Sequence, residues 1–416
     1  MPSDAELIVH VLRRCTFGPT DAQLERFTGS RPTDVIDALL ADEPRPAPPI
    51  RFRGGENDDD FDRALRWWID RMGSDAGGLS ERMVWFWHGH LTSSLEKALP
   101  RLMADQIHLL QQHALGNFRT LMQSITVDPA MLYWLDGSGS TASAPNENYA
   151  RELMELFTLG RHSGAYTEAD VEAGAKALAG WWVQDWDDEN DQPLDEVTAF
   201  FEEEDALQGS VTFLGSRVRN ASDVVDTVCD HPACAPFVAG KIHEYFVGAP
   251  PSQARRAELA EVFRFSGLEI RPVVEAVLRD PEFLDAVGNR PRSPLEWYFA
   301  FERLVQIDVE PWILEELGQL PMQPPNVAGW PDSERWLAGG AVITKAQIAL
   351  DYSWDSETLG AGNQVDEVLR RAGLIDVSND TRSALEAIAS DDEIGRRERA
   401  SLLHAAVAMS PEFNIT

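Results

Sequence analysis

The sequence predicts an all-α protein, with one large multi-helix domain and a small irregular or β insertion near residues 185–215. Three observations support this fold class. Apolar residues recur at helical spacing along most of the 416 residues. Helix-start and helix-stop signals separate these segments. A strand-like pattern is confined to a single acidic stretch, so the sequence favours a helical protein with little sheet.

The individual helices are predicted from apolar periodicity and cap residues. Asp128 precedes a proline, which begins a helix without losing an amide partner. Ser80 and Thr167 are expected N-caps, and Gly160 is expected to end a helix in a left-handed conformation. The helix that follows Thr167 is expected to run to about Trp182. The predicted helical ranges are 5–14, 20–27, 34–40, 61–72, 80–91, 99–116, 118–125, 130–136, 146–159, 167–182, 222–229, 233–246, 253–266, 270–279, 294–306, 311–317 and 343–351.

The domain organisation is predicted from changes in composition. Residues 1–354 form the main helical domain, and 43–60, rich in proline, glycine and acidic residues, form a linker-like excursion. The acidic insertion at 185–215 is expected to contain a strand pair near 198–201 and 211–214. Residues 355–416 are expected to form a helical tail packed on the main domain.

Charge and composition limit the function classes. The chain has 69 acidic and 36 basic residues and a formal net charge of −33, which disfavours a nucleic-acid partner. No apolar run reaches the length of a membrane span, so no membrane association is expected. Residues 1–18 carry paired arginines without an apolar stretch behind them, so a cytoplasmic location is expected. The three cysteines predict free thiols rather than a disulfide framework.

Several segments together resemble one bacterial family. These segments are Arg13–Gly18 (RRCTFG), Trp85–His90 (WFWHGH) with Ser93 and Ser94 behind it, Pro145–Gly160 (PNENYARELMELFTLG), Tyr166–Asp170, Gly180–Trp181, Pro324–Pro331 (PPNVAGWP) and Ser410–Phe413 (SPEF). This set resembles the DUF1800 family, whose function is unknown, over essentially the whole chain. The resemblance implies export for many members, and it supplies no catalytic residues.

The helix predicted over 146–159 carries the first candidate site. In a regular α-helix Asn148, Glu152 and Glu155 lie four and seven residues apart and share one face. Two carboxylates on one face can bind a metal or share a proton with one raised pKa, and Arg151 lies beside them as an electrostatic partner. These four residues are therefore the candidate catalytic residues.

An alternative for the same carboxylates is structural. Glu152 and Glu155 could serve as struts that pair with Arg13, Arg14 or Arg151.

The second candidate site is the His88-Gly89-His90 sequence. Residues two apart on a helix point in nearly opposite directions, but this restriction is lifted if Gly89 ends the helix. His88 and His90 with Glu152 would then suit iron, manganese or zinc, so the cofactor expectation is a divalent metal. The alternative is that both histidines donate to backbone carbonyls within a tryptophan-rich cluster.

The proline-rich loop 324–331 is the third candidate. Such a loop is rigid, and rigid loops often line pockets, so Trp330 and Asn326 are candidates for binding a cofactor. The alternative is that Trp330 only fills the core. The common nucleotide-binding and hydrolase motifs are not found in the sequence.

Two functional hypotheses remain from the sequence. The first is an enzyme, a metal-dependent oxidoreductase or hydrolase, whose buried histidine and carboxylate site acts on a small organic substrate. The second is a non-catalytic partner-binding or maturation protein that holds another polypeptide through its acidic surface and aromatic loops.

Overall fold

The computed structural model describes residues 2–41, 46, 50, 52, 59–74, 77–187, 192–331, 333–356, 358–360 and 362–416. The first four helices are α1 (Asp4–Cys15), α2 (Asp21–Phe27), α3 (Pro32–Ala41) and α4 (Asp59–Gly73). Ser3 and Thr20 form capping boxes at the starts of α1 and α2. The linker-like excursion predicted at 43–60 lies almost entirely outside the described residues.

The central helices are α5 (Gly78–His90), α6 (Pro100–His113), α7 (Phe118–Thr126) and α8 (Pro129–Trp134). Helix α5 is buried on nearly all sides and packs against α4 and α6, as expected for a helix that is apolar around its circumference. The prediction of Ser80 as its N-cap is wrong, because α5 begins at Gly78. The Asp128 side chain caps α8 as predicted, accepting a hydrogen bond from the amide of Met131.

The segment predicted as one helix over 146–159 is divided. It consists of α9 (Asn148–Glu152) and a π-helical turn, η1 (Leu153–Thr158). Gly160 follows with a φ of 91°, so the predicted left-handed end is confirmed. Helix α10 (Glu168–Leu178) begins with the capping box predicted at Thr167, and α11 (Ala221–Asp230) packs on α7 and α10.

Two small antiparallel sheets interrupt the helices. Strand β1 (Trp181–Asp187) pairs with β2 (Gln192–Phe201), and β3 (Val211–Phe213) pairs with β4 (Ser216–Val218). The predicted helical continuation to Trp182 is therefore wrong: Gly180 has a φ of 99°, and aromatic and β-branched residues follow it. The predicted pairing of 198–201 with 211–214 is also wrong. A two-residue turn with positive φ at both Leu214 and Gly215 folds β3 directly onto β4.

The second half of the chain is helical in the described residues. Its elements are α12 (Cys234–Val247), α13 (Gln253–Phe265), α14 (Ile270–Leu278), α15 (Pro281–Asp285), α16 (Pro294–Val305), α17 (Ile313–Glu316), η2 (Ser333–Leu337), α18 (Gly339–Ser353), α19 (Gln364–Arg371), α20 (Asn379–Ala389), α21 (Arg396–Met409) and α22 (Pro411–Asn414). The all-α fold class with a small β insertion is thus confirmed. In the described residues no helix is long and apolar enough to cross a membrane.

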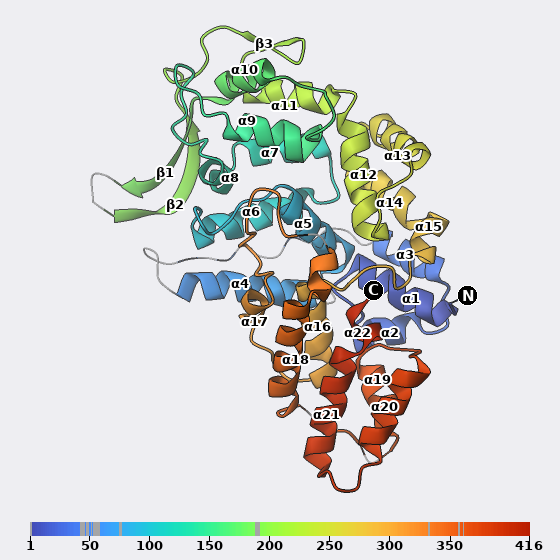
Figure 1. The fold of residues 1–416 in the computed structure, drawn as a ribbon. Coiled ribbons are helices and arrows are strands. Elements are labelled where there is room, and N and C mark those ends of the chain that lie inside the picture. Colours follow the sequence, from blue (N-terminus) through green and yellow to red (C-terminus); the bar gives the residue numbers. More distant parts are fainter. Residues whose placement is uncertain are drawn as a thin grey trace.

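The arrangement in space brings the two ends of the chain together. In Figure 1 the C-terminal helices α19 to α21 form the end of the molecule opposite α10 and β3. The last residue, Thr416, lies close to α1, because Arg14 donates to its backbone oxygen at 2.8 Å. Helix α16 packs against both α19 and α21. One buried apolar cluster runs from Ile8 in α1 to Phe413 in α22, so these helices share a core.

Candidate functional site

The π-helical turn changes the geometry of the predicted carboxylate face. Glu155 pairs with Arg161 at 2.9 Å and lies 3.9 Å from Arg151. Arg151 in turn pairs with Glu147 at 3.2 Å and with Glu168 at 2.8 Å. The strut alternative therefore describes Glu155, although its partners are Arg161 and Arg151 rather than Arg13 or Arg14.

The other two residues of this face have different surroundings. Asn148 is exposed and donates from Nδ2 to Asp136 at 3.1 Å. Glu152 is half-buried, and its Oε2 has no hydrogen-bond partner among the described residues. Burial, with a smaller contribution from the charge of Glu155, raises the pKa of Glu152. The four predicted catalytic residues thus lie on one short segment, and none of them lines the arginine-rich cavity described below.

His88 lies in an aromatic box. Its side chain is fully buried, with the rings of Trp68, Trp85 and Trp330 within 6.0 Å of it. The backbone amide of Met322 donates to Nε2 at 3.2 Å, so Nε2 has no proton and its lone pair is in use. Burial lowers the pKa of His88 to about 3, which keeps the ring neutral.

His90 faces the π-helical turn. Its Nε2 donates to the carbonyl oxygen of Phe157 at 2.9 Å, and its ring stacks on Phe86. The Phe157 carbonyl lies in the last turn of its helix, where it has no partner within the helix. Burial lowers the pKa of His90 to about 4. His90 therefore donates to a backbone carbonyl, as in the alternative to the metal site.

The predicted metal set is not assembled by this geometry. Within the part of the chain that the structure describes, no group of three or more histidine, cysteine, aspartate or glutamate side chains could hold a metal ion. His88 and His90 use Nε2 for separate backbone partners, and Glu152 is not grouped with them. The histidines and Glu152 therefore give no geometric support for the iron, manganese or zinc site.

The loop 324–331 packs against the end of α5. Trp330 stacks on Trp85 with ring centroids 4.7 Å apart. Gly329 has a φ of 85°, and a Cβ there would come within 2.6 Å of the Gly89 carbonyl oxygen, so only glycine allows this approach. Asn326 is exposed, and its Oδ1 accepts from the amide of Ala328 at 2.8 Å. Trp330 is partly buried and packs against the core, which is closer to the packing alternative.

A cavity of about 300 Å³ lies elsewhere, between α1, α16 and α19. This volume is at the lower end of the range for small-molecule sites, about 300–1,000 Å³. The charged side chains that line it are Arg13, Asp21, Arg292, Glu296, Glu302, Arg303 and Arg371. In a chain with nearly twice as many acidic as basic residues, a cavity lined by four arginines is unusual.

Arg292 is the most buried of these arginines. It is 3% exposed, and its guanidinium lies over the ring of Phe413 at 4.7 Å. No side-chain hydrogen bond or ion pair of Arg292 is found with the described residues, and its Nη1 is buried without a partner. Burial, together with the charge of Arg13, holds the pKa of Arg292 well below its usual range. A buried charge without a counter-ion is costly, so this position favours an anion nearby.

Arg13 and Arg303 complete the same side of the cavity. Arg13 donates from Nη2 to the carbonyl of Gly373 at 2.9 Å, and Arg303 donates from Nη2 to the carbonyl of Phe17 at 2.8 Å. Burial lowers the pKa of each to about 10. These bonds fix both side chains through neutral backbone groups. Among the described residues neither arginine makes an ion pair, and Glu302 and Asp21 act on Arg303 only from a distance.

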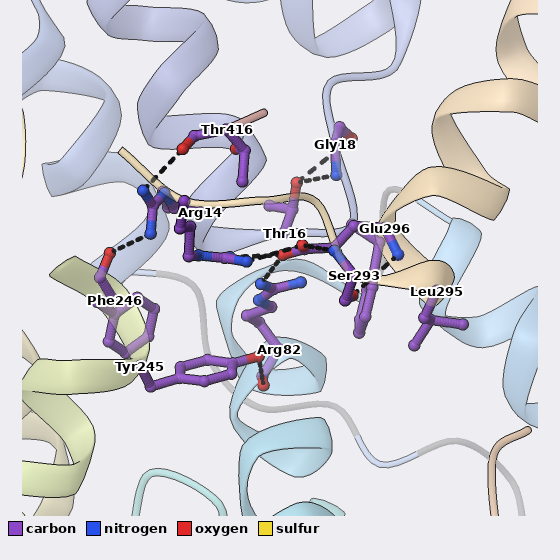
Figure 2. A network of polar contacts seen from close by, with 12 residues as sticks. Arg14, Thr16, Gly18, Arg82, Tyr245, Phe246, Ser293, Leu295, Glu296 and Thr416 are labelled. Carbon is purple, nitrogen blue, oxygen red and sulfur yellow. Dashed lines mark hydrogen bonds and ion pairs between the residues drawn. The ribbon is translucent and has the colours of Figure 1, made fainter. Parts of the chain in front are cut away.

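Glu296 lines the cavity but its charge is already compensated. It pairs with Arg82 (Figure 2). Both of its oxygens also pair with Arg290, at 2.6 and 2.9 Å. Burial alone would raise the pKa of Glu296, but the charges of Arg290 and Arg82 hold it well below its usual range. Its Oε2 also accepts from the amide of Ser293, while its own amide donates to the Ser293 hydroxyl. Together these two bonds form the capping box of α16. Glu296 therefore acts on Arg292 only from a distance, since its oxygens are already paired with two other arginines.

Arg14 forms the second part of this network. It donates to the carbonyl oxygens of Phe246, Ala286 and Thr416 at 2.8 to 3.2 Å, as Figure 2 shows in part. These bonds join α1 to α12 and to the end of the chain. Arg14 thus holds in place the elements that carry the cavity-lining arginines.

The remaining acidic groups of the cavity compensate the arginines weakly. Asp21 is exposed, with 67% of its side chain accessible. Glu302 is half-buried, and burial raises its pKa. The arginines that line this cavity therefore outnumber the buried and half-buried carboxyl groups beside them, Glu296 and Glu302.

The sequence analysis did not single out Arg292, Arg303 or Arg371. One signal was present, since lysine is scarce in the sequence and arginine supplies most of the positive charge. Arginine is the residue that suits bidentate binding of carboxylates and phosphates. The cavity itself was not predictable, because it joins segments that lie more than 250 residues apart.

Comparison with known proteins places the chain in a family. The chain matches none of the curated proteins and none of the solved structures with which it was compared. A family model described as protein of unknown function, DUF1800, matches residues 10–415. Because that match covers nearly the whole chain, the protein belongs to the DUF1800 family.

Proposed function

We propose that this protein binds a small anionic organic molecule in the arginine-lined cavity. One observation carries the proposal: Arg292 is 3% exposed, lines the cavity, and makes no ion pair with the described residues. A carboxylate or phosphate group beside it would supply charge-assisted hydrogen bonds, which are about twice as strong as neutral ones. The proposed binding site for a small organic molecule is therefore the arginine-lined cavity, and not the histidines and Glu152 as predicted from the sequence.

The test is calorimetric titration of the native protein with small carboxylates and inorganic phosphate. Binding is expected in the native protein and lost in Arg292→Met, which keeps the length of the side chain and removes the charge. Arg279→Gln is the matched control, since Arg279 is 46% exposed and pairs with Asp37 and Glu275 on a remote surface. Equal anion binding by the native protein and Arg292→Met would contradict the proposal.

A second candidate function is binding of a protein partner. Trp182 and Phe200 are directly opposite each other in the β1–β2 pair, and they are 36% and 37% exposed. In Figure 1 these strands extend from the side of the molecule. Exposed aromatic residues that lie side by side are typical of surfaces that bind another protein.

This candidate is tested by comparing the native protein with a Trp182→Ser/Phe200→Ser double variant in partner capture. A stoichiometric partner that the double variant fails to hold supports it. Identical capture by both proteins argues against the aromatic pair.

A further inference from the structure

The four arginines of the cavity come from two parts of the fold. Arg13 lies in the last turn of α1, Arg292 precedes α16, and Arg303 lies within α16, so these three form one side. Arg371 belongs to the last turn of α19, among the C-terminal helices. The charges of the first three act on one another, whereas the charge of Arg371 acts on Glu367 and His404. The cavity therefore has two separate positively charged groups: Arg13, Arg292 and Arg303 on one side, and Arg371 on the other.

Arg371 has unused hydrogen-bond donors, as Arg292 has. Its side chain is 7% exposed, and its Nη2 pairs with Glu367 at 2.7 Å. Its Nε and Nη1 are buried without a hydrogen-bond partner in the described residues. Each side of the cavity thus has one arginine that is more than nine-tenths buried and incompletely bonded.

The size of the cavity fits more than a single oxyanion. Its volume of about 300 Å³ equals the share of roughly ten water molecules, about 30 Å³ each. One phosphate or one acetate would satisfy the free arginine donors on one side and leave those on the other side without a partner. A ligand with acidic groups at both ends would accept hydrogen bonds from both.

We propose that the ligand is a small organic dianion whose two acidic groups are separated by a short carbon chain. One group binds Arg292 with its neighbours Arg13 and Arg303, and the other binds Arg371. This inference rests on the proposed function and specifies its ligand class. Dicarboxylates and phosphorylated carboxylates share the required chemistry.

A ligand of this kind would also join two parts of the fold. In the described residues Arg13 already donates to the Gly373 carbonyl, across the same boundary between α1 and the end of α19. A bridging dianion would add a second connection between α16 and α19. Amide exchange in α19 is therefore expected to slow when a dianion is bound, and to change little with a monoanion.

The experiment is a titration of the full chain with butyrate, succinate, glutarate, 3-phosphoglycerate and inorganic phosphate. The native protein is expected to bind at least one of the two dicarboxylates or the phosphorylated acid about tenfold or more tightly than butyrate. In Arg371→Met that preference is expected to fall to near one, with butyrate binding retained. Arg371→Lys, which keeps the charge, is expected to retain part of the preference and to show that the site still folds.

The outcomes separate the two proposals. Equal affinity for butyrate and the dianions would overturn the proposal that the ligand is a dianion. A preference for dianions that survives in Arg371→Met would overturn it as well. In both cases an anion site would remain. Binding of none of the five anions would overturn the proposed function, and the dianion with it. A stronger response to 3-phosphoglycerate than to the dicarboxylates would identify the phosphorylated class.

Discussion

The guanidinium of Arg303 lies directly against the backbone of Gly18. Its Nη2 donates to the carbonyl of the preceding Phe17 at 2.8 Å, and a Cβ added to Gly18 would overlap the guanidinium, so Arg303 would have to move. Gly18 also has a φ of 105°, which other residues rarely adopt. The turn after α1 is thus shaped to receive an arginine of the cavity.

Gly18→Ala is predicted to lower the free energy of unfolding by about 2–4 kcal/mol, because it adds backbone strain and displaces Arg303. Anion binding should weaken in the same variant. Denaturant unfolding measures the first effect and titration the second. Gly164→Ala is the control: Gly164 has a φ of 66° but nothing within 4 Å of an added Cβ, so only about 1 kcal/mol is expected. Equal losses in the two variants would contradict the role of Arg303.

Glu296→Gln is predicted to destabilise the protein by about 3–5 kcal/mol, because it leaves Arg82 and Arg290 buried without a counter-ion. Glu275→Gln breaks an exposed pair with Arg279 and should cost less than about 1 kcal/mol. Urea unfolding of both variants gives the comparison. If Glu296→Gln lowers the free energy of unfolding by less than about 1 kcal/mol, the Glu296 carboxylate is not an essential counter-ion of Arg82 and Arg290.

Stability is predicted to fall as the pH drops from about 6.5 to about 4. Burial lowers the pKa of four histidines to between about 3 and about 4: His10, His88, His90 and His404. The unfolded chain takes up protons at these rings below about pH 6.5, while the folded protein does not, so acid favours unfolding.

Buried carboxyl groups oppose this trend. Burial raises the pKa of Asp128 to about 7 and also raises the pKa of Glu81, Glu152 and Glu302, so the folded protein takes up protons there more readily than the unfolded chain does. Six histidines with a lowered pKa, His113 and His231 included, outnumber these four carboxyl groups. The test variant is His10→Gln, which keeps a donor for the Phe283 carbonyl. Its slope of unfolding free energy between pH 5 and 6 should be smaller by up to about 1.4 kcal/mol per pH unit. An unchanged slope would mean that His10 titrates alike in both states.

Glu152→Gln is predicted to change the free energy of unfolding by less than about 1 kcal/mol, or to raise it slightly. The Oε2 atom is buried without a partner, and Glu155 repels it. Thermal unfolding and elemental analysis of the native protein and the variant test this. Stoichiometric metal that is lost in Glu152→Gln would restore the histidine and carboxylate site.

Local signals in the sequence predicted the helices well. The caps at Asp128 and Thr167 and the left-handed Gly160 depend on residues within four positions, and each lies where it was expected. The π-helical turn at Leu153–Thr158 was not predictable in this way. It is accompanied by long-range contacts, such as the bond from His90 to the Phe157 carbonyl.

The candidate site depends almost wholly on long-range packing. Arg13 and Gly373 are joined by one hydrogen bond across 360 positions, and periodicity gives no information on such a pair. The paired histidines attracted attention because His-x-His suits a metal. The structure uses them for backbone bonds, since buried carbonyl and amide groups need partners.

Arg292→Met tests the central claim most directly, when its free energy of unfolding is measured with and without a bound small anion. Without the anion the variant is predicted to be as stable as the native protein, or more stable by about 1–4 kcal/mol, because a buried unpaired charge is removed. With the anion only the native protein should gain stability. A variant that is less stable without the anion, and that still gains stability with it, would show that Arg292 is a structural residue and that the cavity is not an anion site.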